Sequence, residues 1–233
     1  MKLSVPKYDW EHNTFRKKPH FKRWAKEHEA VVNLNNKTTV INVEILDRTK
    51  DDLQIPTKYR VTYHLRSIVG LEDNGQNPIF GEEHQAEFEI PKEYPAKACT
   101  IYMRTPVWHP NIRSKGTYIG RVCANSDLFG PTYMLDQLIL RVGEVLQYKN
   151  YHALNTWPYP DDGDAAKWVL DYAEPNDVVN KWKEIYTDER ELIFWDASLV
   201  EEKKPIIKIK SQKEHDPGPV QKLRLGLKKK EDE

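Results

Sequence analysis

Four short stretches of the chain alternate apolar and polar residues with a period of two. The first covers residues 41–45, and the others begin at Tyr59, Ala86 and Cys99. Because side chains of a β-strand point alternately to opposite faces, each stretch predicts a strand with one buried face. Clusters of Gly, Pro, Asp and Asn separate the stretches, as turns between antiparallel strands require. The pattern predicts a four-stranded antiparallel meander with one apolar face that other elements must cover.

Helical periodicity supplies the elements that can cover this face. Apolar residues recur at intervals of three and four over residues 21–34, before the first predicted strand, which predicts an N-terminal helix. The strongest apolar stripe follows the last strand and consists of Leu135, Leu138, Ile139, Val142 and Leu146. Weaker helical patterns return over residues 165–172 and 178–186. The predicted fold class is α+β: an N-terminal helix, the four-stranded meander, a central helix that covers it, and C-terminal helices.

Composition divides the chain of 233 residues into three segments. Residues 1–18 are polar and basic, which predicts an N-terminal arm. Nothing aromatic follows Trp195, and residues 196–233 consist largely of Lys, Glu, Pro and short aliphatic pairs. Such a segment can bury little apolar surface, so it predicts a flexible charged tail. Residues 19–195 are then expected to form one domain.

Charge and cysteine content argue against several classes of protein. Lys+Arg and Asp+Glu both number 36, so the chain has no excess of cations with which to bind nucleic acid. Two cysteines cannot form a disulfide framework, which favours a reducing compartment. The first residues lack the apolar core of a signal peptide, and no run of about 18 apolar residues occurs. We therefore expect a cytoplasmic protein that binds neither nucleic acid nor membrane.

A long irregular segment, residues 105–130, separates the last predicted strand from the central helix. Long irregular segments inside compact domains are often functional. This one contains Cys123, whose thiol is either presented as a nucleophile or buried for packing. Cys99 lies on the apolar side of a predicted strand, which favours a packing role for it. The irregular segment is therefore where we expect the chemistry of the protein.

His109, Pro110 and Asn111 precede Cys123 in the same segment. His109 is either a general base or a ring that braces a turn, because Pro110 restricts its backbone to extended values. Asn111 can donate its amide to an oxyanion or cap the turn. The eight histidines and two cysteines lack the spacing of a metal site, and no glycine loop for phosphate is present. No metal is therefore expected.

The order of these motifs resembles the ubiquitin-conjugating enzyme family. That family has a Pro-x-x-Gly turn, a Tyr-Pro element, a His-Pro-Asn triplet and a catalytic cysteine, followed by a Trp-x-Pro. Here they read Pro78-Ile79-Phe80-Gly81, Pro91-Lys92-Glu93-Tyr94-Pro95, His109-Pro110-Asn111-Ile112, Gly120-Arg121-Val122-Cys123 and Phe129-Gly130-Pro131. The resemblance covers residues 20–190. Each motif alone is weak, and the ordered set is specific.

The chain also departs from the family pattern. Eleven residues, 112–122, separate Asn111 from Cys123, where the family usually has fewer, so a surface loop is lengthened. Ala98 and Cys99 replace the prolines that usually follow Tyr-Pro. Acidic residues near the cysteine are not obvious, and Asp127, Asp161, Asp162 and Asp164 are the candidates. Such departures resemble the divergent relatives encoded in bacterial operons for ubiquitin-like conjugation.

The resemblance implies an acyltransferase. Cys123 would accept the C-terminus of a ubiquitin-like modifier from the thioester of an activating enzyme and pass it to an amine, a lysine of a target protein. Asn111 would act with it in catalysis, while His109 and Pro110 fix the geometry of the active site. Asn150 and Asp127 would line the site. No cofactor is implied, because the activating enzyme uses the ATP, and the need for a ligase stays open.

A basic surface and an alternative function complete what the resemblance implies. The family presents such a surface to its activating enzyme, and it is matched here by Lys17, Lys18, Lys22, Arg23 and Lys26. An ordinary solvated helix face is an equal interpretation of these residues. The alternative function is a non-catalytic variant that binds ubiquitin-like proteins. Because such variants characteristically lack the cysteine, the presence of Cys123 favours an enzyme.

Overall fold

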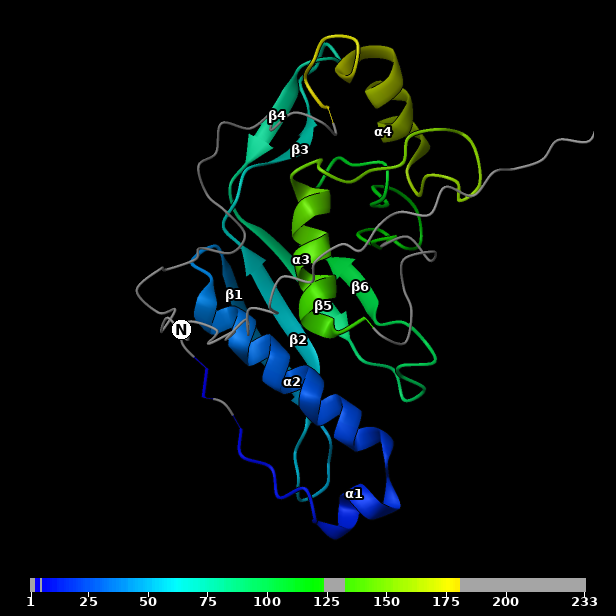
Figure 1. Cartoon of the computed structure of the whole chain (residues 1–233). Coiled ribbons are helices and arrows are strands. Elements are labelled where there is room, and N and C mark those ends of the chain that lie inside the picture. Colours follow the sequence, from blue (N-terminus) through cyan, green and yellow to red (C-terminus); the bar gives the residue numbers. More distant parts are fainter. Residues whose placement is uncertain (1–2, 5, 124–132, 181–233) are drawn as a thin grey trace, which may run out of the picture. The chain divides into compact units, whose positions relative to one another are not determined.

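The predicted four-stranded antiparallel sheet is confirmed. The computed structural model describes residues 3–4, 6–123 and 133–180. The strands of the sheet are, in spatial order, β1 (Ile41–Arg48), β2 (Pro56–Tyr63), β5 (His84–Glu89) and β6 (Thr100–Met103) (Figure 1). Every pairing between them is antiparallel. Sequence neighbours among the four predicted stretches are therefore neighbours in the sheet.

A second, two-stranded sheet was not predicted from the alternation. It pairs β3 (Ser67–Leu71) with β4 (Pro78–Gly81). The Pro78-Ile79-Phe80-Gly81 motif, expected as a turn, is thus a strand, and that prediction is wrong. The chain turns instead between the two strands, where the N–H of Gly75 donates to the carbonyl of Glu72 at 2.8 Å. Strands of five and four residues that are largely half-buried or exposed carry too little alternation to be recognised.

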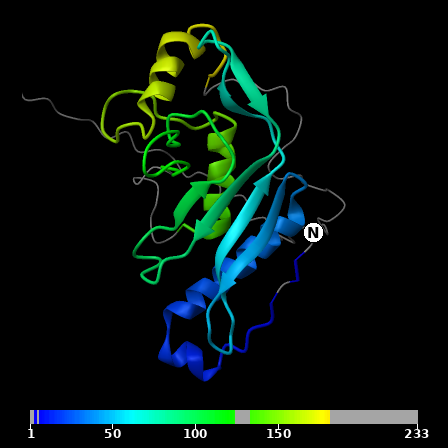
Figure 2. The same ribbon diagram turned by 180° about the vertical axis from the view of Figure 1, so that it is seen from behind.

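The predicted N-terminal and central helices are both present and lie on one face of the sheet. They are α2 (His20–Lys37) and α3 (Leu135–Leu146), and Figure 2 shows the strands in front of them. Two fully buried tyrosines of β2 join the layers. The Tyr59 hydroxyl lies 3.2 Å from Nδ1 of His28, and Tyr63 donates to the Ile139 carbonyl at 2.9 Å. The apolar face is therefore covered as expected, and none of the helices in the described ranges is long and apolar enough to cross a membrane.

The C-terminal helices agree with the prediction in part. Helix α4 (Gly163–Trp168) and one π-helical turn, η2 (Val169–Ala173), occupy the helix expected over residues 165–172. Of the helix expected over residues 178–186, residues 178–180 are not helical and the rest lies outside the described residues. The Phe129-Gly130-Pro131 motif and the expected tail, residues 196–233, also lie outside them.

The segment expected to be a polar arm contains a short helix and part of the core. Helix α1 (Asn13–Lys17) carries Phe15, which is 1% exposed. Its ring lies 6.3 Å from that of Tyr8 and is stacked 5.4 Å from that of Trp10. Three aromatic rings can bury a large apolar area even where most neighbouring residues are polar. These residues add to the hydrophobic core around α2, while the boundary at residue 18 stays a prediction.

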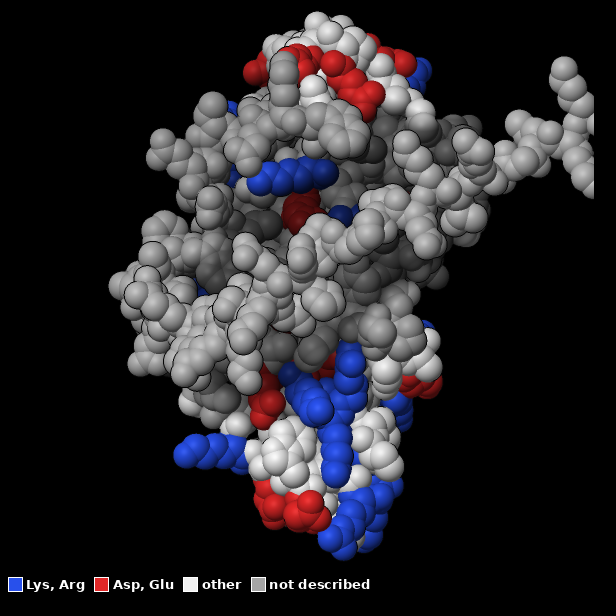
Figure 3. Space-filling model, viewed as in Figure 1, with Lys and Arg blue, Asp and Glu red and all other residues white. Residues whose placement is uncertain are grey.

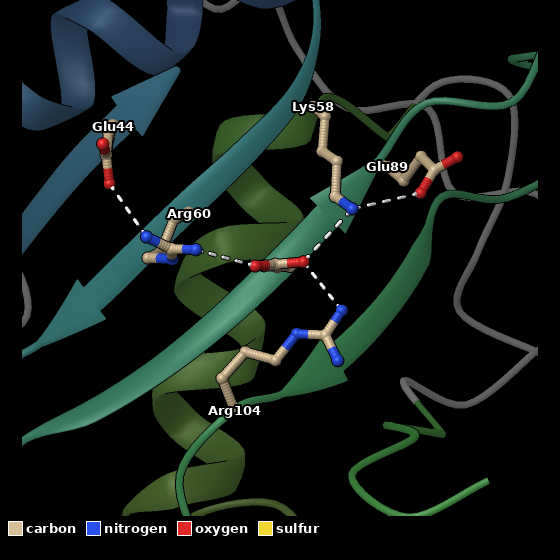
Figure 4. A network of polar contacts seen from close by, with 6 residues as sticks. Glu44, Lys58, Arg60, Glu89 and Arg104 are labelled. Atoms are coloured by element: carbon tan, nitrogen blue, oxygen red, sulfur yellow. Dashed lines mark hydrogen bonds and ion pairs between the residues drawn. The ribbon is translucent and has the colours of Figure 1, made fainter. Parts of the chain in front are cut away.

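The face of the sheet opposite the helices carries a charged network centred on Glu87 of β5 (Figure 4). Its carboxylate accepts hydrogen bonds from Arg104 at 2.7 Å and Arg60 at 3.1 Å, and Nζ of Lys58 lies 3.2 Å away. The hydrogen bond from Arg104, with those from Arg60 and Lys58, outweighs burial and lowers the pKa of Glu87 to about 2. Glu87 is thus a carboxylate that stays charged although it is only 8% exposed.

We predict that Glu87 contributes stability that disappears in acid. The pKa of Glu87 in the folded protein lies below its ordinary value of 4.5, so its contribution is complete above pH 4.5 and is lost as the pH falls toward 2. Glu87→Gln should lower the free energy of unfolding by roughly 1 kcal/mol at neutral pH and flatten its dependence on pH in that window. Denaturant titrations from pH 2 to 7 measure both effects.

Glu44→Gln is the matched control, because Glu44 contacts only Arg60 in this network and its side chain is 62% exposed. It should change the free energy of unfolding much less than Glu87→Gln does. Equal effects of the two substitutions at every pH would contradict the role given to Glu87.

Candidate active site

The backbone before Cys123 extends the sheet beyond β6. The N–H of Met103 donates to the Gly120 carbonyl at 2.7 Å, and the N–H of Val122 donates to the Ile101 carbonyl at 3.0 Å. Between these two contacts, Arg121 is paired with Tyr102 as in a short antiparallel bridge. Cys123 therefore follows a segment that is fixed by strand-type hydrogen bonds, although the sequence indicated an irregular loop.

Gly120 is the residue that permits this close pairing. Its φ of +82° lies in the left-handed region, and a Cβ at this position would lie 2.3 Å from the carbonyl oxygen of Met103. Any other residue would combine a strained backbone with a clash against backbone atoms, which cannot move aside as a flexible side chain can. The glycine three residues before Cys123 is thus required by the geometry of the segment.

Asn111 joins the Cys123 segment to the loop that follows α3. Its carbonyl accepts the N–H of Cys123 at 2.8 Å, and its amide Nδ2 donates to the Cys123 carbonyl at 3.3 Å. Its Oδ1 accepts the N–H of His152 at 2.9 Å. Both ends of the amide are engaged and the residue is only 5% exposed. The geometry supports a role in holding the loops around the cysteine, and a direct part in catalysis stays a prediction.

His109 has the environment of a structural histidine. It is fully buried, and its Nδ1 accepts the N–H of Asn111 at 3.0 Å. Its ring lies 4.5 Å from that of Tyr148. Burial lowers the pKa of His109 to about 3, an effect that the nearby backbone of Asn150 opposes in part. A neutral ring that holds the turn, the second of the two interpretations offered by the sequence, fits these contacts. Pro110 contributes its carbonyl, which accepts the N–H of Asp162 at 2.9 Å.

Asp161 ties both ends of the lengthened loop to the segment before α4. Its side chain is 7% exposed and accepts hydrogen bonds from Arg113 at 3.1 Å and from Nε of Arg121 at 3.2 Å. The pKa of Arg121 is raised chiefly by the hydrogen bond to Asp161 and in smaller part by Cys123. A guanidinium held by a nearly buried carboxylate therefore lies within electrostatic range of the cysteine.

The neighbouring carboxylates are engaged by the same loop. Asp162 accepts the N–H of Ser114 at 2.9 Å, its hydroxyl, and the N–H of Ala165 at the start of α4. Asp164 pairs with Lys115. The sequence left open which acidic residue lies near the cysteine, and it did not predict these pairings. The signal that was available is charge complementarity between the cations of residues 113–121 and the carboxylates of residues 161–164.

The two cysteines differ in the way the sequence suggested. Cys99 is 9% exposed and belongs to the hydrophobic core. Burial, with a smaller effect of Glu27, raises the pKa of its thiol to about 12. Cys123 is partly exposed. Because the thiolate is the nucleophile, burial makes Cys99 a poor nucleophile, whereas Cys123 is not buried to that extent.

The remaining predicted site residues are Asn150, Asp127 and the basic residues around the N-terminal helices. Asn150 directly precedes the loop tied to Asn111 and is partly exposed, while Asp127 lies outside the described residues. Figure 3 shows lysine and arginine side chains gathered over α1 and α2. Of the predicted basic surface, the exposed residues are Lys17, Lys18, Lys22 and Lys26. Arg23 is turned inward instead and donates to Glu27 at 2.5 Å and to the Tyr133 carbonyl at 2.7 Å.

No metal site accompanies these residues in the parts of the chain that the structure describes. There, no group of three or more His, Cys, Asp or Glu side chains is arranged to hold an ion. The described groups thus consist of one partly exposed cysteine, a buried neutral imidazole, an amide and a set of paired charges. Such a site is suited to nucleophilic chemistry at a cysteine.

Comparisons with known proteins identify the family of this α+β domain. A family model described as ubiquitin-conjugating enzyme matches residues 62–157. Ubiquitin-conjugating enzyme E2 N of Macaca fascicularis is 26% identical over 137 residues, which cover 56% of this chain and 80% of that protein. The Drosophila melanogaster protein of the same name is 26% identical over 141 residues, with coverages of 58% and 83%. A solved Toxoplasma gondii ubiquitin conjugating enzyme E2 domain matches with a TM-score of 0.43 and 17% identity, covering 65% and 89%.

The matched range of residues spans His109, Pro110, Asn111 and Cys123. Together with the two curated relatives, this match supports a member of the ubiquitin-conjugating enzyme family. The identities of 26% make it a divergent member.

We predict that Gly120→Ala destabilises the protein more than Gly116→Ala does. Both glycines have a φ of +82°, but a Cβ at residue 116 would meet nothing within 4 Å. Backbone strain alone should cost Gly116→Ala about 1–2 kcal/mol. The added clash with Met103 should bring Gly120→Ala to roughly 3 kcal/mol or more. Urea titrations of the two variants test this, and equal losses would show that the approach of residue 120 to β6 is looser than described.

Proposed function

We propose that this protein is a ubiquitin-like-protein conjugating enzyme. Cys123 would accept the modifier from the thioester of an activating enzyme and transfer it to an amine of a target protein, a lysine. The observation that carries the proposal is a partly exposed thiol at the matched place in an ordered family motif. A non-catalytic variant that binds ubiquitin-like proteins is the alternative, and the presence of Cys123 speaks against it.

Two acyl transfers make up the proposed reaction. In the first, Sγ of Cys123 attacks the terminal glycyl carbonyl, and the thiol of the activating enzyme leaves. In the second, a lysine amine attacks the same carbonyl, Cys123 leaves as a thiol, and the amine loses its proton. A thioester is already activated, so positioning and partial desolvation of the lysine can supply much of the rate. This suits a site whose histidine is buried and neutral, and no cofactor enters either step.

Asn111 is proposed to support these transfers by holding the loops on either side of Cys123. Its two side-chain hydrogen bonds, to the Cys123 carbonyl and from the N–H of His152, support this positioning role. An amide N–H that also reached the oxyanion of the tetrahedral intermediate would stabilise it directly. These two roles make different predictions for the step that is slowed.

The proposed partners follow from the family. They are an activating enzyme, a ubiquitin-like modifier and a target protein. For the activating enzyme, we propose Lys17, Lys18, Lys22 and Lys26 as the contact surface. The gathering of basic side chains over α1 and α2 in Figure 3 supports this proposal. We leave Arg23 out of this surface, because it is engaged by Glu27 and Tyr133. We expect the enzyme to work in the cytoplasm, since its two cysteines are free thiols.

We predict that Cys123 forms an adduct with the modifier that reductant cleaves. Incubation with an activating enzyme, modifier and ATP, followed by gels with and without reductant, measures it. Cys123→Ser should give a reductant-resistant ester or no adduct, because a hydroxyl is the poorer nucleophile. Cys99→Ser is the matched control and should retain the thioester. An adduct that survives Cys123→Ala would sink the assignment.

We predict that Asn111→Ala slows transfer to lysine more than loading of Cys123. The loss should be roughly 10²–10³-fold if the amide donates to the oxyanion. Asn111→Asp keeps an acceptor for the N–H of His152 and loses the donor, so it should be as slow as Asn111→Ala in that case. If Asn111 only holds the loops, Asn111→Asp should transfer faster than Asn111→Ala, and the melting temperature should follow the transfer rate. Single-turnover discharge to free lysine, measured beside melting curves, distinguishes the two roles.

A further inference from the structure

The loop between α3 and α4 is tied at both ends to the immediate surroundings of Cys123. At one end, the N–H of His152 donates to Asn111, whose amide in turn donates to the Cys123 carbonyl. At the other end, Asp161 accepts from Arg121, which lies two residues before Cys123. The intervening stretch, residues 153–160, is therefore anchored on each side by a hydrogen bond to a residue near Cys123.

This anchored stretch and the lengthened loop carry exposed apolar side chains. Five such residues, here called the apolar rim, are Tyr118 (50% exposed), Ile119 (63%), Leu154 (56%), Trp157 (71%) and Tyr159 (63%). They are five of the nine large apolar side chains that are most exposed in the described parts of the chain. The two loops are joined at their bases, because Arg113 and Arg121 both bind Asp161. More than half of the most exposed large apolar side chains in the described ranges thus lie on the two loops that border the proposed site.

Exposed tryptophan and tyrosine side chains can contribute strongly to the binding energy of a protein interface. Exposed apolar surface on a folded domain is a feature of sites where a partner binds. Tryptophan and tyrosine are enriched among the residues that dominate binding energy, since each buries a large area at a small entropic cost. Trp157, at 71% exposure, has most of that area available.

We propose that the apolar rim binds the target protein beside the acceptor lysine, so that the site favours lysines flanked by apolar residues. This inference rests on the proposed function. An amine that attacks the thioester on Cys123 must come within bonding distance of it, so its neighbours must lie over the bordering loops. The carboxylates of Asp161, Asp162 and Asp164 are already engaged by residues of the lengthened loop. Apolar contact is therefore an attraction that the described residues of these two loops offer to an acceptor segment.

Two short peptides of equal charge test this preference on the full chain. One has its lysine flanked by Leu and Phe, and the other has its lysine flanked by Ser and Gly. Fluorescence anisotropy measures their binding to the unloaded protein, and single-turnover discharge of the loaded Cys123 measures their reactivity. We expect the apolar peptide to bind more tightly and to discharge faster.

Variants of the apolar rim should remove this preference. Trp157→Ala should weaken binding and slow discharge to the apolar peptide roughly five- to tenfold, while slowing discharge to free lysine far less. Tyr159→Ala should act in the same direction. Leu170→Ala is the matched control, because Leu170 is an exposed apolar residue of η2 outside the rim, and it should change neither measurement.

Three results would overturn the proposal. The first is equal binding of the two peptides. The second is that Trp157→Ala slows discharge to the apolar peptide and to free lysine equally. The third is that Leu170→Ala weakens binding of the apolar peptide as much as Trp157→Ala does. Loss of self-association in Trp157→Ala, seen by sedimentation, would also overturn it and assign the rim to a contact between copies. The binding measurement needs no thioester, so it tests the rim even if Cys123 is not loaded and the proposed function fails.

Discussion

The carboxylate of Glu27 holds the framework on which the site is built. It is fully buried and accepts the Tyr94 hydroxyl at 2.7 Å, Nε of Arg23 at 2.5 Å and the N–H of Leu135 at 2.5 Å. A buried charge is costly unless such partners compensate for its lost hydration. Here the partners come from α2, from the Tyr-Pro element and from the first turn of α3, where the helix dipole also favours a negative charge. The two ends of the segment from Tyr94 to Leu135 therefore donate hydrogen bonds to the same carboxylate, and Cys123 lies within that segment.

The same principle recurs nearer the cysteine. Asp161 and Asp162 accept hydrogen bonds from Arg113, Ser114 and Arg121, which lie 40 to 48 residues earlier in the chain. Each carboxylate takes more than one donor, which fixes geometry more firmly than an exposed ion pair does. Glu87 does so across the outer face of the sheet, where Lys58, Arg60 and Arg104 come from β2 and from the residue after β6. A chain with no net charge is thus organised by carboxylates that are locally matched with cations.

The sequence predicted those parts of the fold that depend on local periodicity. The alternation around Tyr59 and the apolar stripe of α3 are regular because each element buries one face. Strands β3 and β4 were missed because they are short and bury little, and Phe15 was missed because one aromatic residue is not a pattern. At the site, the ordered motif indicated Cys123 and Asn111. The pairing of Arg121 with Asp161 depends on how two distant loops fold against each other, which no local pattern contains.

The contacts around Cys123 suit a reaction that needs positioning more than proton transfer. His109 is held neutral by burial and Asn111 is engaged at both ends of its amide, while Gly120 lets the preceding strand approach β6 closely. In a site of this kind, the rate of transfer from a thioester depends on where the incoming amine is held. The fixed residues cannot adapt to different acceptors, since each is committed to a backbone contact. Side chains such as Trp157 and Tyr159, exposed on a loop anchored at both ends, are free to make contacts that select an acceptor without disturbing the cysteine.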